Sequence, residues 1–106
     1  MIIKYHKLVR DKIPQIIRDG GSTCKCSVLS HEDYLVMLDQ KLLEELSEYQ
    51  ESKNLEELAD LLEVIHAVAK ARGSSFEKID EIRKQKANER GGFRERILLE
   101  EVDQSL

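Results

Sequence analysis

The sequence predicts an all-α fold, and three features carry that prediction. Charged residues make up 36% of the 106 residues and aromatic residues only 5%, with a single proline, a balance typical of long amphipathic helices. Leucines recur at helical spacing through the middle of the chain, and capping residues or glycines separate the periodic segments. We therefore expect a bundle of four to five helices with an antiparallel helical hairpin at its core, completed by oligomerisation.

The length and the net charge of the chain limit the classes of protein to which it can belong. A chain of 106 residues is expected to form a single domain over residues 1–106. The net charge of -4 gives no general attraction to nucleic acid or to an anionic membrane. No apolar run approaches the roughly 20 residues that span a bilayer, and the first residues lack the apolar region of a signal peptide. We therefore expect a cytoplasmic protein without nucleic-acid or membrane partners.

The N-terminal third predicts one short helix followed by an irregular segment. Pro14 suits the first turn of a helix, and Gly20-Gly21 stops it. Residues 22–30 are small and β-branched, which predicts a loop or a short edge strand. Cys24 and Cys26 are two residues apart, too close for an easy structural disulfide and without a second cluster to complete a zinc site, so we expect reduced thiols.

Three further helices follow. Ser30 with Asp33 predicts the start of a helix over residues 31–51, and Asn54 with Glu57 predicts the start of another that ends at Gly73. Residues 75–90 predict a fourth helix, which stops at two glycines. The tail, residues 93–106, carries an apolar patch that could pair as a strand or pack on a partner: Ile97, Leu98 and Leu99.

Two acidic clusters flank the turn between the second and third predicted helices. Residues three apart on a helix share a face, with Cβ atoms about 5 to 6 Å apart, which pairs Glu45 with Glu48 and Glu57 with Asp60. Glu48 lies five residues before Lys53 and Glu57 lies four after it, while Glu45 lies eight before and Asp60 seven after. At about 1.5 Å of rise per residue, an antiparallel hairpin brings all four carboxylates to one place.

Converging carboxylates repel one another unless a cation lies between them. A ligand set made only of oxygens suits Mg²⁺, or Mn²⁺, and such an ion can polarise a phosphoryl oxygen and turn a bound water into a nucleophile. Acidic helices also carry such patterns by chance, so a solvated face remains an equal alternative. Glu44, turned about 100° around the helix, is either a base for the attacking water or a surface residue.

Basic residues could hold a phosphate chain near this site. One face of the fourth predicted helix begins with apolar residues and becomes basic at Lys86 and Arg90. The alternative explanation is that a helix C-terminus favours cations in any case. Arg10 and Lys12 are a second cationic pair, and their alternative is a surface charge or a salt bridge to one of the acids. Lys41 lies four residues before Glu45, so an ion pair with it is at least as well supported as contact with a substrate.

Four sequence blocks, taken together, resemble one enzyme family. The chain is similar to the MazG-like, all-α nucleoside triphosphate pyrophosphohydrolases in four blocks: KLLEELSE (residues 41–48), EELAD (56–60), KLVRDKIP (7–14) and KANERGGF (86–93). The N-terminal and C-terminal blocks are similar to those of a small branch related to phosphoribosyl-ATP pyrophosphohydrolase. The resemblance covers about residues 5 to 100, and the order of the blocks is more specific than the acidic pattern.

The resemblance implies Mg²⁺-dependent hydrolysis between the α and β phosphates of a nucleotide in a helical dimer or tetramer. It implies Glu44 as the base and places the other roles as follows: metal ligands Glu45, Glu48, Glu57 and Asp60; phosphate contacts Arg10, Lys12, Lys86 and Arg90. The spacer between Glu48 and Glu57 is shorter than in many members, which leaves the base pocket and the substrate open.

Three functions follow as hypotheses. The first is removal of non-standard nucleoside triphosphates, and the second, with the same chemistry, is hydrolysis of phosphoribosyl-ATP in histidine biosynthesis. The third is a non-catalytic helical dimerisation or regulatory module, in which the acidic residues form a solvated face or bind a metal only structurally.

Overall fold

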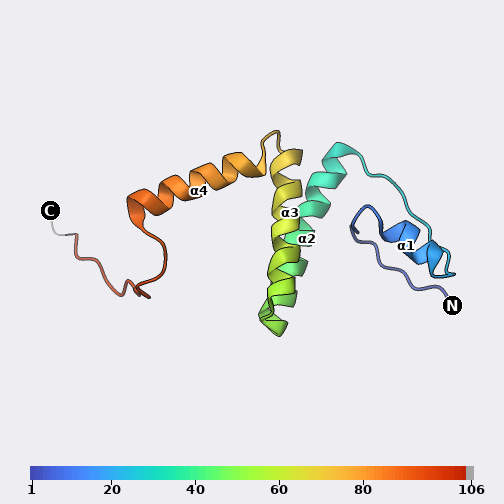
Figure 1. The fold of residues 1–106 in the computed structure, drawn as a ribbon, viewed down its shortest axis with the longest axis horizontal. Coiled ribbons are helices and arrows are strands. Elements are labelled where there is room, and N and C mark those ends of the chain that lie inside the picture. Colours follow the sequence, from blue (N-terminus) through green and yellow to red (C-terminus); the bar gives the residue numbers. More distant parts are fainter. Residues whose placement is uncertain (105–106) are drawn as a thin grey trace. The chain divides into compact units, whose positions relative to one another are not determined.

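A computed structural model describes residues 1–104 of the chain. Its helices, in chain order, are α1 (Ile13–Asp19), α2 (His31–Ser52), α3 (Leu55–Ala71) and α4 (Phe76–Arg90) (Figure 1). None of residues 1–104 belongs to a strand, which confirms the all-α prediction. Residues 22–30 are therefore a loop, and the tail forms no strand as far as residue 104; its last two residues lie outside the described part.

Side-chain caps begin α2 and α3 where the sequence predicts them. The Ser30 hydroxyl accepts the Asp33 backbone N–H at 3.2 Å, and the Asn54 side-chain oxygen accepts the Glu57 N–H at 3.0 Å. Each bond satisfies one of the free N–H groups of a helix start, and such a cap typically contributes about 1 kcal/mol. The helix bounds accordingly agree with the prediction to within two residues at each end.

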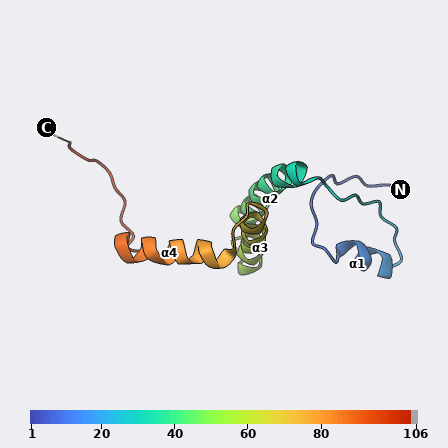
Figure 2. The same cartoon turned by 90° about the horizontal axis from the view of Figure 1, so that it is seen from above.

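A connection of two residues turns α2 back along α3. Lys53 adopts a left-handed backbone conformation with φ of 60°, and its N–H donates to the Tyr49 carbonyl at 2.7 Å, which closes the last turn of α2. The next residue, Asn54, already caps α3. The two helices consequently lie side by side, as Figures 1 and 2 show from two directions. The predicted antiparallel hairpin is therefore present.

The hairpin buries little apolar surface. Only three apolar side chains are buried among residues 1–104, namely Leu38, Val64 and Ala69. Other leucines of α2 and α3 remain exposed, including Leu43, Leu46, Leu55, Leu58 and Leu62. No helix within these residues is both long enough and apolar enough to cross a membrane.

The chain divides into two compact units, residues 1–76 and 77–106. The first unit holds α1 and the hairpin, and the second holds α4 beyond Phe76. No residue of α4 is buried, and its charged side chains pair with one another along the helix. The expectation of one domain over residues 1–106 stays a prediction.

Candidate metal centre

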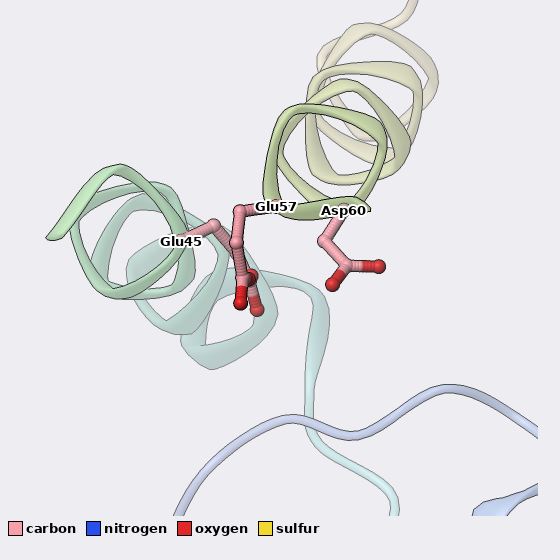
Figure 3. A group of neighbouring side chains, drawn as sticks. All are labelled: Glu45, Glu57 and Asp60. Atoms are coloured by element: carbon pink, nitrogen blue, oxygen red, sulfur yellow. The ribbon is translucent and has the colours of Figure 1, made fainter. Parts of the chain in front are cut away.

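Three carboxylates meet at the side of the hairpin. Glu45 comes from α2, whereas Glu57 and Asp60 come from the first turns of α3. Figure 3 shows the three side chains projecting to the same side of the two helices. One carboxylate oxygen of each lies within 4.8 Å of the others, so a single ion could contact all three.

The spacing and chemistry of these oxygens fit a small hard cation. Octahedral Mg²⁺ has bonds of about 2.1 Å, which places neighbouring ligands about 3 Å apart and opposite ligands about 4.2 Å apart. The three carboxylate oxygens, which lie within 4.8 Å of one another, are close to these separations. Among residues 1–104, no histidine or thiolate joins the group, and an oxygen-only set suits Mg²⁺ or Mn²⁺ better than zinc.

Glu45 is the buried member of the group. It is 7% exposed, and its Oε2 has no hydrogen-bond donor among the described residues. Burial raises the pKa of Glu45, and the nearby Glu48 carboxylate raises it further, against the opposing effect of the Lys41 ammonium. A buried acceptor without a donor normally costs about 1–3 kcal/mol. This oxygen is therefore the strongest local indication that a cation belongs here.

Glu57 and Glu48 add to the excess of negative charge. Loss of hydration raises the pKa of Glu57, and the Glu48 carboxylate, followed by the charge of Asp60, raises it further. Glu48 is half-buried and interacts with both Glu45 and Glu57, but it is not one of the three residues whose oxygens lie within 4.8 Å of one another. Its role as a fourth ligand stays a prediction.

Two lysines hold the carboxylate of Glu44. Lys41 Nζ lies 3.1 Å from Glu44 Oε2 and 3.4 Å from Glu45 Oε1, and Lys7 Nζ lies 3.1 Å from Glu44 Oε1. Burial alone would raise the pKa of Glu44, but the hydrogen bonds from Lys41 and Lys7 outweigh it and lower that pKa. The ion pair between Lys41 and Glu45, one of the two alternatives for Lys41, is therefore present. Glu44 is thus ionised at neutral pH, as a general base must be, but it is a weaker base than a free glutamate.

Lys7 is the interacting residue that sequence reasoning missed. It lies 37 positions before Glu44, so no helical spacing connects the two. The available signal was its place at the start of the KLVRDKIP block, which also contains Arg10 and Lys12.

Arg10 lies beside the carboxylates. Its guanidinium donates to Asp60 Oδ1 at 2.7 Å, so the salt bridge considered as an alternative to phosphate binding is present. Lys12 is exposed at the N-cap of α1, two residues farther along. The N-terminal segment therefore brings cations to the acidic end of the hairpin through both Lys7 and Arg10.

Lys86 and Arg90 are exposed residues of α4 in the second unit. Arg90 is the last residue of that helix, as the sequence predicts. Their contact with a phosphate chain stays a prediction.

A comparison with known proteins gives a short match. A protein of Mycolicibacterium smegmatis (strain ATCC 700084 / mc(2)155), described as an uncharacterized protein, is 48% identical to this chain over 42 residues. The match covers 40% of this chain and 43% of that protein. No family description matches the chain, and no solved structure matches it. Any assignment of function therefore depends on the sequence blocks and on the geometry of the carboxylates.

Proposed function

We propose that the protein is a MazG-like, Mg²⁺-dependent nucleoside triphosphate pyrophosphohydrolase that cleaves between the α and β phosphates. Its products would be a nucleoside monophosphate and pyrophosphate, and its role the removal of non-standard nucleotides in the cytoplasm. The observation that carries the proposal is the convergence of Glu45, Glu57 and Asp60, with the buried Glu45 Oε2 lacking a donor. The order of the four sequence blocks supports the choice of substrate class.

The three carboxylates would hold the cation, with Glu48 as a further ligand. When bound, Mg²⁺ supplies Lewis-acid stabilisation of charge on phosphate oxygens. The arrangement of these carboxylates on two helices suits metal binding because a hairpin with a two-residue turn fixes both helices before the substrate arrives.

The remaining residues of the first unit would position the reactants. Glu44, held by Lys7 and Lys41, would orient the attacking water and accept its proton. Arg10 already lies at the edge of the carboxylate group, where its guanidinium could donate to a phosphate oxygen in place of Asp60. Lys12 would supply further positive charge to the phosphate chain.

We propose a homodimer or homotetramer as the active form. The support is the apolar surface that α2 and α3 leave exposed: Leu55 is 80% exposed and Leu43 is 68% exposed. A soluble bundle normally buries such side chains against another element. Light scattering on the purified chain would measure the number of subunits.

The decisive experiment is a survey of nucleoside triphosphates, canonical and modified, with Mg²⁺ or Mn²⁺. Chromatography of the products should show a monophosphate and pyrophosphate in equal amounts. Glu57→Gln should lower the rate at least roughly 100-fold, since it removes one carboxylate of the group. Glu56→Gln is the matched control, because Glu56 is the exposed neighbour of Glu57 and lies outside the three-carboxylate group.

Two results would redirect the proposal. Turnover of phosphoribosyl-ATP alone would favour a biosynthetic enzyme with the same chemistry. Absence of pyrophosphate from every nucleotide, together with no effect of Mg²⁺ or Mn²⁺ on melting temperature, would favour the non-catalytic dimerisation or regulatory module.

A further inference from the structure

Two cysteines lie side by side in the loop between α1 and α2. Cys24 and Cys26 are both free thiols, and their sulfur atoms are 3.9 Å apart. Cys24 is half-buried and Cys26 is exposed, so a solute can reach the pair. Neither residue takes part in the carboxylate group or in the contacts around it.

The sulfur separation fits a metal ion better than a disulfide. A disulfide requires sulfurs about 2 Å apart. Two thiolates bound to one tetrahedral ion, each with a bond of about 2.3 Å, lie about 3.8 Å apart. The observed 3.9 Å is therefore close to the separation of two thiolates that share one ion.

Hydrogen bonds hold the pair in this arrangement. The Cys26 thiol donates to Cys24 Sγ, and the Cys24 thiol donates in turn to the Pro14 carbonyl of α1 at 3.8 Å. The hydrogen bond with Cys24 raises the pKa of Cys26, and the opposing charge of Arg18 does not offset this effect. A cation must therefore displace the two thiol protons, and once bound it would keep the sulfurs together.

We propose that Cys24 and Cys26 form a two-thiolate binding site for a thiophilic d¹⁰ metal ion, the class that includes Zn²⁺, Cd²⁺ and Cu⁺. Thiolate ligands select these soft ions over Mg²⁺, so this site and the carboxylates would bind different metals. On binding, each thiol releases its proton to the buffer and each sulfur forms one bond to the ion. Two protein ligands leave the other coordination positions to water or a small thiol, which predicts an exchangeable ion rather than a closed structural one.

The test is a titration of the reduced, full-length protein with Cd²⁺, followed by the ultraviolet thiolate-to-cadmium charge-transfer absorption. We expect saturation at one ion per chain. Cys24→Ser and Cys26→Ser should each weaken binding roughly 100-fold, because the second thiolate of a chelating pair binds intramolecularly. Excess Mg²⁺ and the Glu45→Gln substitution should leave the absorption unchanged, since neither affects a sulfur atom.

Several results would overturn this site. One is the absence of charge-transfer absorption, and another is Cd²⁺ affinity in either serine variant equal to that of the unmodified chain. Competition by Mg²⁺ would also overturn it, because the ion would then belong to the carboxylates. Melting curves of both serine variants without metal verify folding, so that a loss of binding reports the lost thiolate. None of these outcomes depends on pyrophosphohydrolase activity.

Discussion

Glu45 in the hairpin and Asp80 in α4 are both carboxylates on helices, yet their surroundings shift their pKa values in opposite directions. Asp80 accepts from Arg83 Nε at 2.8 Å and lies 3.4 Å from Lys84 Nζ, and these partners, Arg83 first, lower its pKa. Glu45 has one lysine, a like-charged neighbour and a buried oxygen without a donor, and its pKa is raised. The negative charge of an acid with cations one turn away is balanced within its own helix. Acids brought together from two helices need a cation from elsewhere.

The largest expected effect is loss of the metal response in Glu45→Gln. At a concentration of about 100 times Kd, Mg²⁺ should stabilise the unmodified protein by about 2.7 kcal/mol. The variant should lose most of this, because the buried ligand is gone, and should be no less stable than the unmodified chain without metal. Melting followed by circular dichroism, with and without Mg²⁺, measures both. An undiminished Mg²⁺ shift in Glu45→Gln would contradict the comparison.

Lys41→Met should have the next largest effect. It removes the cation that lies between Glu44 and Glu45 but keeps most of the side-chain length. We expect the metal-free protein to lose about 2 kcal/mol, the typical cost of leaving a partly buried charge without its hydrogen bond. Urea denaturation measures the loss. Adding Glu45→Gln to the same chain should recover part of it, and equal losses in both backgrounds would show that Lys41 acts elsewhere.

The contributions of Glu45 and Asp80 to stability should depend on pH with opposite slopes. The pKa of Glu45 is raised above 4.5, so its contribution to the stability of the metal-free protein is fully present below that pH and is lost as pH rises through the higher folded value. The pKa of Asp80 is lowered below 3.8, so its contribution is present above that pH and is lost as pH falls through the lower folded value. Carboxyl titrations by nuclear magnetic resonance would measure both groups. Equal directions of shift would refute the contrast.

Asp80→Asn should give the smallest effect. Its ion pairs are solvent-exposed, so the variant should lose only a little helix at low salt, and high salt should remove the difference. Circular dichroism at two salt concentrations would detect the change. The Mg²⁺ response should be unaffected, and a reduced response would mean that Asp80 takes part in the metal centre.

Local rules predicted the helices well because the determinants are close in sequence. Ser30 and Asn54 each lie three residues from the N–H that they accept, so the chain specifies these helix starts without tertiary information. Nearly equal spacing from Lys53, eight residues before it and seven after it, likewise predicted that Glu45 and Asp60 would be level across the hairpin, and both belong to the three-carboxylate group. The same spacing could not predict that the oxygens of Glu48 lie outside that group, because this depends on the side-chain conformations in the folded hairpin.

The sequence by itself determined which segments are helical, where they begin, and that acids from two of them meet at one end of a hairpin. Only the tertiary structure decided which acid is buried, which lysines hold Glu44, and that Cys24 and Cys26 hold their sulfurs at the separation of a shared ion. The physical reason is the separation along the chain over which each interaction acts. Caps and helical periodicity act over three or four residues, whereas burial and contacts such as Lys7 with Glu44 depend on segments that meet only after the chain has folded.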